Sequence, residues 1–385
     1  MYINDNNKNN RIVFLTGTRA DYGKMKSLIK AVEASNEFVP YIFATGMHML
    51  SIYGTTHIEI VKDGFKNIYP FVNQNDNTNM DITLSNTITG FSNYINQINP
   101  AAIVVHGDRL EALAGAIVGA LNNIKVFHIE GGEISGTIDE SIRHAISKFS
   151  HYHLVSNEEA KKRVLQMGEP EENIFIIGSP DIDIMYSDSL PSLDNVKSHY
   201  EIDFNSYSIF MYHPVTTELP LLEKHIHTVI KSLIESQENF VAIYPNNDAG
   251  SRIILKELSL IKDHPRFRIF PSMRFESFLT LLKNADCIVG NSSSGIREAG
   301  IYGIPAIDIG TRQYGRYIES ANSNIVHVNE DITEVFAALF KAKSLHPEPL
   351  SYYGSGNSNI LFMDILRQRK IWNSDIQKKF IDIDF

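Results

Sequence analysis

The stretch HIEGGEISGTIDESIRH, residues 128–144, places four acidic residues, two histidines and an arginine among three glycines. It lies between an apolar run and a segment with helical periodicity. Thr137 and Glu140 have the spacing of a helix capping box, and Asp139 with Arg143 has the spacing of an i,i+4 ion pair. This part of the charge is therefore explained by a helix that begins in the second half of the stretch.

Three residues in the first half, His128, Glu130 and Glu133, have no such local explanation. Glu130 directly follows a buried strand, where a partly desolvated carboxylate suits acid–base chemistry. Asp108 follows another apolar run, in HGDRLEA (106–112). Taken alone, Asp108 with Glu111 is best interpreted as a capping box. If the two strands are neighbours, however, Asp108 and Glu130 converge, and the pair indicates a proton-transfer site.

A third polar turn, TGTRADYGK (16–24), follows the first apolar run. Its glycines, helix start and basic residues predict an anion site, with Arg19 as the phosphate contact. It is not a Walker A loop, because five residues separate Gly17 from Gly23 and Met25 stands where Ser or Thr is required.

The second half of the chain offers neutral and hydroxyl groups instead. Small residues in NSSSGIREAG (291–300) let a backbone approach a phosphate, and Glu298 is placed to accept from a ribose diol. His213 is a candidate for neutralising a diphosphate, although a single histidine is more often structural. Three further polar turns follow strands: HPVTTE (213–218), YPNNDAGS (244–251) and GTRQYGR (310–316).

The elements that carry these turns alternate between β-branched runs and helical segments. This alternation predicts parallel βαβ units, in which ligands bind beyond the carboxyl ends of the strands. A polar, strand-poor stretch at 187–208 interrupts it. We therefore predict an α/β domain over residues 1–184 that carries the acid–base carboxylates, and a second over 185–366 that carries the nucleotide site. A C-terminal helix at 367–385 is expected to pack back on the first domain.

The composition limits the function classes. The chain has 385 residues, 43% of them hydrophobic and 21% charged, and a net charge of −10, which argues against nucleic-acid binding. A single cysteine, Cys287, favours a reducing compartment. The N-terminus lacks a signal peptide pattern, and the longest apolar run, at 112–121, is too short to span a bilayer. We expect a cytoplasmic protein without a membrane partner.

Metal and hydrolase signatures are weak. His225 and His227 are two apart in a helix and do not share a face. His151 and His153 could share a strand face, but no cysteine accompanies them, so structural roles are expected. The chain has no G-x-S-x-G elbow, which leaves a Ser-His-Asp hydrolase unsupported.

These motifs together closely resemble the hydrolysing UDP-N-acetylglucosamine 2-epimerases of sialic-acid biosynthesis. The matching stretches run in order from residue 16 to 316: TRADYGK, HGDRLEA, HIEGGEISGTIDESIRHAISK, HPVTTE, PNNDAGS, GNSSSGIREAG and GTRQYGR. The resemblance implies a glycosyltransferase-B type fold, with two doubly wound Rossmann-like domains facing a cleft that holds UDP. It implies elimination of UDP to a glycal and rehydration to N-acetylmannosamine.

The resemblance also implies roles for individual residues. Proton transfer falls to Asp108, Glu130 and Asp139, and His213 stabilises the leaving diphosphate with Arg19 and Arg312. The nucleotide is held by Asn246, Ser292, Ser293, Ser294, Gly295 and Glu298. Lys24, Arg109 and Arg143 lie near the sugar or its carboxylates. No metal or redox cofactor is expected, and the family's assemblies imply a homodimer or homotetramer.

Two other readings stay open. The same chemistry on a UDP- or GDP-linked 2,4-diacetamido-trideoxy sugar, of the legionaminic-type pathway, uses the same motifs. A glycosyltransferase of the same fold would share the nucleotide site but needs only one base, so three acids weigh against it.

Overall fold

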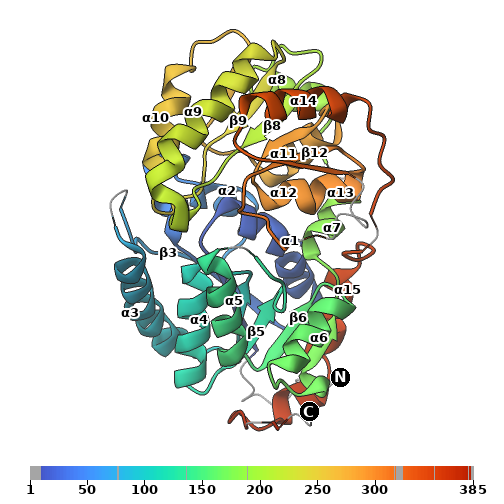
Figure 1. Ribbon diagram of the computed structural model, residues 1–385. Coiled ribbons are helices and arrows are strands. Elements are labelled where there is room, and N and C mark those ends of the chain that lie inside the picture. Colours follow the sequence, from blue (N-terminus) through green and yellow to red (C-terminus); the bar gives the residue numbers. More distant parts are fainter. Residues whose placement is uncertain are drawn as a thin grey trace. The chain divides into compact units, whose positions relative to one another are not determined.

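The computed structural model describes residues 10–75, 78–135, 137–188, 190–315, 317, 324–350, 352–379 and 381–382 (Figure 1). The chain forms two compact units. The first comprises Met1–Glu133, Asp139–Ser187 and Tyr353–Phe385, and the second comprises Ile134–Ile138 and Asp188–Tyr352. The sequence prediction set the boundary between residues 184 and 185, and the structure divides the units between Ser187 and Asp188.

The first unit is built on a parallel sheet of seven strands in the order β3-β2-β1-β4-β5-β6-β7. The order reverses between β1 and β4, which pair in register from Ile12 opposite Ala102. In doubly wound sheets, ligands bind beyond the strand ends at such a reversal. The strands are β1 (Arg11–Thr16), β2 (Val39–Ala44), β3 (Ile68–Pro70), β4 (Ala102–His106), β5 (Lys125–Ile129), β6 (Tyr152–Val155) and β7 (Ile174–Ile176).

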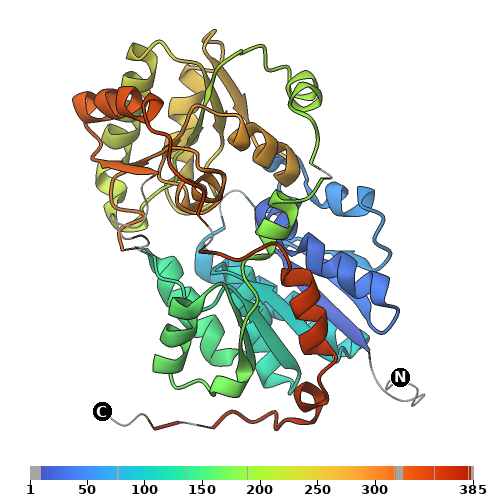
Figure 2. The same cartoon turned by 90° about the vertical axis from the view of Figure 1, so that its right-hand side faces the viewer.

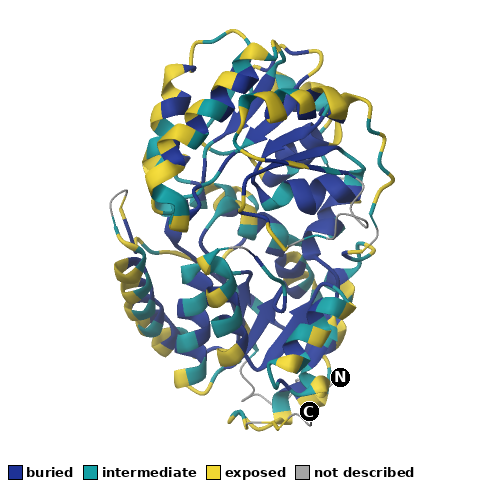
Figure 3. Cartoon of the chain, in the orientation of Figure 1, coloured by how far each residue is buried: buried dark blue, intermediate teal, exposed yellow. Residues whose placement is uncertain are grey.

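Helices cover both faces of this sheet, which explains why its strands are apolar on both sides. Along β1, Ile12 and Phe14 face one core, which includes residues of α1 and α15. Val13 and Leu15 face the other core, with residues of α3, α4 and α5. Figure 3 shows these strands as buried. The helices are α1 (Arg19–Ser35), α2 (His57–Lys62), α3 (Met80–Ile98), α4 (Leu110–Leu121), α5 (Ile138–Phe149), α6 (Glu158–Gln166), α7 (Pro180–Met185), α15 (Ser358–Leu366) and α16 (Arg369–Asn373), with 3-10 turns at Gly46–Met49, Ser51–Tyr53 and Glu171–Asn173.

The C-terminal segment returns to the first unit at Tyr353, earlier than the predicted residue 367. Figure 2 shows α15 beside α1, and the two helices are in contact. Phe362 is fully buried in the core of this unit, and Trp372 stacks on Phe38 with ring centroids 5.7 Å apart. The segment is therefore part of the hydrophobic core rather than an appended tail.

The second unit has a parallel sheet of six strands in the order β10-β9-β8-β11-β12-β13, which reverses between β8 and β11. Gly290 allows these two strands to meet, because a Cβ at this position would lie 2.0 Å from Met211 O, and its φ is +131°. The strands are β8 (Ser208–Met211), β9 (Phe240–Ile243), β10 (Phe267–Phe270), β11 (Ile288–Gly290), β12 (Ala306–Ile309) and β13 (Ile325–Val328).

Helices of the second unit follow the same alternation. Residues of α9, α10 and α14 share one core with the strands. The helices are α8 (Leu193–His199), α9 (Leu219–Glu235), α10 (Ser251–Leu260), α11 (Phe275–Lys283), α12 (Ser293–Ile296), α13 (Glu298–Tyr302) and α14 (Ile332–Lys343), with a 3-10 turn η4 (Thr216–Glu218). The predicted class of two doubly wound α/β domains is confirmed. In the described part of the chain, no helix is both long and apolar enough to cross a membrane.

Candidate active site

The two carboxylates predicted to converge follow neighbouring strands. β4 and β5 pair in parallel, with His106 opposite Ile129, so Asp108 and Glu130 leave the sheet at the same edge. The prediction that these strands are neighbours is confirmed. The capping-box interpretation of Asp108 is wrong, because the N-cap of α4 is Arg109 and it makes no side-chain capping bond. Asp108 therefore precedes the helix.

Arg143 joins the two acids. This α5 side chain is only 5% exposed, and its Nη2 forms a short ion pair with Asp108 Oδ2. Its Nη1 donates to the backbone oxygen of Glu130 at 2.6 Å and lies 3.6 Å from Glu133 Oε2. A guanidinium presents several donors in a fixed plane, so one residue fixes the relative positions of three acidic residues.

Glu130 is held in a strained and buried position. Its φ is +62°, in the left-handed region that a residue with a Cβ rarely adopts, at a cost of about 1–3 kcal/mol. Ser179 Oγ donates to Glu130 Oε1 at 2.9 Å, and His106 Nε2 lies 3.2 Å from Glu130 Oε2. Such strain persists only where surrounding contacts impose it, so the fold orients this carboxylate closely.

His128, which the sequence left unexplained, is a positioning residue. It is fully buried, with Nε2 at 2.8 Å from Gly107 O and Nδ1 at 3.1 Å from Ser147 Oγ. Burial lowers the pKa of His128 to about 3, so the imidazole is neutral near pH 7. It ties the turn before Asp108 to helix α5, which also carries Arg143. Asp139 lies in the first turn of the same helix.

The predicted anion turn after β1 is occupied by the chain's own carboxylate. Asp21 accepts from the backbone N–H of Gly17 and of Thr18, each at 3.0 Å, and forms a capping box with Thr18. These amides are therefore engaged in this structure. Arg19 is the first residue of α1, and its Nη2 lies 3.9 Å from Glu59 Oε1, so a phosphate contact here would come from its guanidinium.

Two further acids lie beside the predicted basic residues: Asp181, which the sequence did not single out, and Glu111, which it gave only as a capping residue. Lys24 Nζ lies 3.2 Å from Oδ2 of Asp181, a fully buried acid in α7. Arg109 Nε lies 3.4 Å from Oε2 of Glu111, which is 1% exposed. The Glu111 carboxylate is so close to the backbone of Gly17 that a Cβ there would lie 2.7 Å from its Cδ. Both acids lie in helices that follow strands, α4 after β4 and α7 after β7. Their position after a strand is the sequence feature that could have indicated them.

In the second unit, His213 is fixed by two asparagines. The backbone N–H of His213 donates to Asn291 Oδ1 at 2.6 Å, and Asn291 Nδ2 donates back to His213 O at 2.9 Å. The backbone N–H of Asn246 donates to His213 Nδ1 at 3.0 Å. Since Nδ1 accepts, Nε2 is the ring nitrogen that carries the proton in the neutral histidine. Asn291 is buried and was not predicted.

Asn291 also holds the loop after β12. Its backbone oxygen accepts from Gln313 Nε2 at 2.7 Å and from Arg312 Nη1 at 3.2 Å. His213 and Arg312, which come from two separate motifs, are therefore joined through one residue. Asn246 Oδ1 is buried and accepts no hydrogen bond from the described residues, while its Nδ2 donates to Asp248.

The serine-rich loop opens a broken helix rather than a continuous one. Ser292 caps the short helix α12 by accepting from Ser294 N, and the helix direction changes at Arg297 (φ −95°, ψ −78°) before α13. Glu298 begins α13 and is 2% exposed. Ser293 and Ser294 occupy the first turn of α12 and Gly295 is buried within it. All of these residues follow β11, at the reversal of the strand order.

The two other histidine pairs make different contacts, and His151 and His153 are structural. His151 accepts from Val126 N through Nδ1, and His153 Nε2 lies 3.1 Å from Glu169 Oε2. The expectation of structural roles for them is confirmed. His225 and His227 contact different acids, as expected for an i,i+2 spacing, with His227 on Glu257 and His225 on Glu330.

Comparisons with known proteins agree with this architecture. The family described as UDP-N-acetylglucosamine 2-epimerase matches residues 30–367. The protein of that name from Neisseria meningitidis serogroup B is 46% identical over 378 residues, which cover 97% of this chain and 99% of the relative. The UDP-N,N'-diacetylbacillosamine 2-epimerase (hydrolyzing) of Legionella pneumophila is 34% identical over 357 residues, covering 91% and 93%.

A solved structure has the same fold. The crystal structure of the UDP-GlcNAc 2-epimerase from Neisseria meningitidis bound to UDP-GlcNAc superposes with a TM-score of 0.77 at 19% identity. The match covers 92% of this chain and 99% of that one. At this identity the likeness supports the two-domain α/β architecture.

Proposed function

Since this chain belongs to the UDP-N-acetylglucosamine 2-epimerase family, we propose that it is a hydrolysing enzyme that converts UDP-N-acetylglucosamine and water to N-acetylmannosamine and UDP. The observation that carries the proposal is the pair of acids at the ends of β4 and β5. Asp108 and Glu130 lie at one sheet edge, and a single buried guanidinium from Arg143 holds them there.

The reaction needs at least two acid–base groups. In the first step a carboxylate removes the proton from C2 while the C1–O bond to UDP breaks, which leaves a glycal with a C1–C2 double bond. In the second step an acid returns a proton to C2 from the other face, and water adds at C1. Asp108, Glu130 and Asp139 are the candidates for these transfers, and the rigid support of Glu130 suits a group that must meet one carbon atom.

The second unit supplies the groups for the nucleotide. His213 presents a proton on Nε2, and Arg312 is held to the same asparagine, so both suit the negative charge that develops on the leaving diphosphate. The buried Oδ1 of Asn246 needs a hydrogen-bond donor, which a nucleobase or ribose would provide. We assign the ribose to Glu298 and the phosphates to the loop Ser292–Ser293–Ser294–Gly295, as expected from the motifs.

The alternative sugar is the second candidate. The Legionella relative, at 34% identity, carries the name of a 2-epimerase for a diacetamido sugar, whereas the 46% identical relative carries the name of the N-acetylglucosamine enzyme. The higher identity over nearly the whole chain favours UDP-N-acetylglucosamine. We also propose that the protein is cytoplasmic and that it forms a homodimer or homotetramer. Light scattering on the purified protein would test the oligomeric state.

The experiment that tests the function is proton NMR of the purified protein with UDP-N-acetylglucosamine in deuterated water. We expect free UDP together with N-acetylmannosamine that carries deuterium at C2. UDP-N-acetylmannosamine instead of free sugar would identify a non-hydrolysing epimerase. Turnover only of UDP-N,N'-diacetylbacillosamine would select the alternative substrate. UDP release without deuterium at C2 would contradict the elimination and leave a transferase or a simple hydrolase.

A further inference from the structure

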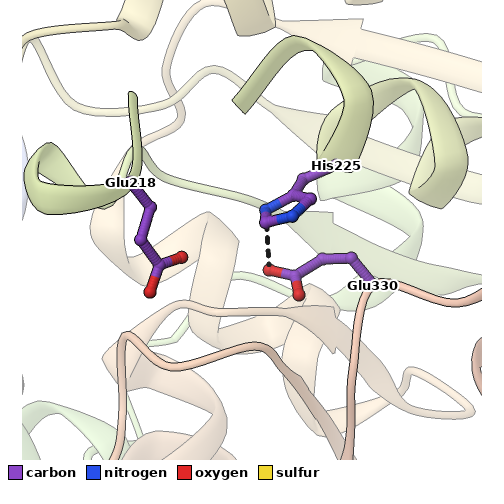
Figure 4. A group of neighbouring side chains, drawn as sticks. All are labelled: Glu218, His225 and Glu330. Carbon is purple, nitrogen blue, oxygen red and sulfur yellow. Dashed lines mark ion pairs between the residues drawn. The ribbon is translucent and has the colours of Figure 1, made fainter. Parts of the chain in front are cut away.

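Three side chains of the second unit converge outside the proposed nucleotide residues. Glu218 ends η4, His225 lies two turns along α9, and Glu330 follows β13 (Figure 4). One possible ligand atom from each of the three lies within 4.8 Å of the other two. Among the described residues, this is the group of His, Cys, Asp and Glu side chains close enough together to hold a metal ion. The chain therefore brings together an imidazole and two carboxylates that are far apart in sequence.

The carboxylates are oriented by neutral donors on other elements. Thr311 Oγ1 donates to Glu218 Oε1 at 2.6 Å, and Tyr212 OH donates to Glu330 Oε1 at 2.9 Å. Donors that orient ligating groups in this way are a regular feature of metal sites.

The backbone also accommodates the group. Gly310 has a φ of +76°, and a Cβ there would lie 2.2 Å from Glu330 Oε1. The carboxylate thus lies directly against the start of the loop that carries Arg312. A side chain at position 310 would displace it, so the glycine keeps this space open.

In the described residues, the two carboxylates of the group form no ion pair with a lysine or arginine. Glu330 is 11% exposed at its side chain, and its ion-pair partner is His225, with Nδ1 3.5 Å from Oε1. Two partly buried carboxylates at this separation repel each other, and a divalent cation between them would remove that repulsion.

We propose that Glu218, His225 and Glu330 bind a divalent transition-metal ion. An imidazole with two carboxylates suits Zn²⁺, Mn²⁺ or Co²⁺, whereas Ca²⁺ and Mg²⁺ prefer oxygen ligands alone. Bonds of about 2.0–2.2 Å put two ligands of a tetrahedral ion about 3.3–3.6 Å apart. Ligand atoms that lie within 4.8 Å of one another therefore need to close by up to about 1.2–1.5 Å. The ion joins the start of α9, the segment after β13 and the Gly310–Arg312 loop.

Cation binding is measured directly, by titrating Zn²⁺ into the untagged, chelator-treated full chain in a calorimeter. Replacing Zn²⁺ by Co²⁺ adds visible absorption bands that report the coordination geometry of the bound ion. We expect one ion per chain. His225→Gln should weaken binding at least about tenfold, since even groups that only orient a metal ligand are worth 10–100-fold. Glu330→Gln should have a similar effect.

The matched control is His227→Gln on the same helix, whose side chain is 67% exposed and contacts Glu257 instead. This variant should bind the ion as the unchanged chain does. The proposal would be overturned if the unchanged chain bound no ion or if His225→Gln bound it with unaltered affinity. It would also be overturned if His225→Gln and His227→Gln lost affinity equally. An unchanged circular dichroism spectrum and urea midpoint in the metal-free variants show that they are folded. Because the readout is the ion itself, failure of the epimerase assignment leaves this test intact.

Discussion

Two basic candidate residues of the first unit, Arg143 and Lys24, form ion pairs with acids, whereas His213 of the second unit is held by neutral hydrogen bonds with asparagines. Arg143 contacts Asp108 and Glu133 in the first unit, and Lys24 contacts the buried Asp181. In the second unit, Asn291 exchanges amide hydrogen bonds with the backbone of His213.

This difference fits two kinds of task. Buried charges are costly to desolvate and therefore remain where a reaction moves protons or charge. Neutral, backbone-directed bonds hold a shape without depending on protonation. We infer that the first unit carries the pH-dependent chemistry and the second the recognition of an anion, and the predictions below test that division.

Acid should destabilise the first unit most. Burial lowers the pKa of His48 and His151 to about 4 and that of His128 to about 3, and it also lowers the pKa of His153. Below about pH 6.5 the unfolded chain protonates these imidazoles while the folded chain does not, so stability falls as pH falls from 6.5 toward 4. Each contributes up to about 1.4 kcal/mol per pH unit.

Urea unfolding at pH 7.5 and 5.5, followed by fluorescence of the single tryptophan, Trp372, measures this effect. Trp372 lies in the first unit, on α16. His128→Gln should reduce the dependence on pH, whereas His199→Gln, at an exposed position of α8, should not. Equal urea midpoints at the two pH values would contradict the prediction.

Asp108→Asn should abolish most turnover and keep nucleotide binding. An amide cannot exchange the proton, so kcat should fall at least about 100-fold, the usual scale of a general acid–base group. The UDP dissociation constant, measured by calorimetry, should stay unchanged. Asp364→Asn, an acid of α15 with a side chain 60% exposed, is the matched control. Near-normal turnover of Asp108→Asn would remove this residue from the mechanism.

Glu298→Ala should do the reverse. It removes a buried acceptor proposed for the ribose, so UDP affinity should fall by about tenfold, the lower end for a hydrogen bond to a charged group. kcat at saturating substrate should change less. Glu276→Ala, in the first turn of α11, is a control in the same unit. An unaltered UDP dissociation constant for Glu298→Ala would count against the ribose assignment.

Asp21→Ala should have the smallest effect. It removes the capping box of α1 and releases the amides of Gly17 and Thr18, which should cost about 1 kcal/mol of stability. Urea unfolding followed by Trp372 fluorescence measures it. Turnover should fall less than in Asp108→Asn. A loss of turnover as large as that of Asp108→Asn would mean that Asp21 acts in the chemistry itself.

The sequence was sufficient to predict the alternation of strands and helices and the edge at which the motifs meet. Parallel strands place their carboxyl ends on one side, so Asp108 and Glu130 could be brought together from order alone. The short strand β3 and helix α3 were not predicted. For β3 the reason is that Ile68–Pro70 is too brief and too exposed to give a strand pattern.

The partners of the predicted residues could not be read from spacing. Asp181, Ser179 and Asn291 reach the sites from segments distant in sequence, and only the packing of the fold brings them there. The turn after β1 illustrates the opposite error. Its pattern predicts a phosphate site, but a nearby carboxylate of the chain itself, Asp21, accepts from the amides of the turn.

The return of residues 353–379 to the first unit has a consequence for biosynthesis. Phe362, Leu366 and Ile371 are fully or almost fully buried in the core beside α1. A ribosome delivers them after the whole second unit has been made. The second unit can therefore complete its fold during translation, while the earlier-made first unit exposes apolar surface until its last helices arrive. A chaperone that binds nascent chains should thus recognise the N-terminal half for longer than its early position in the chain suggests.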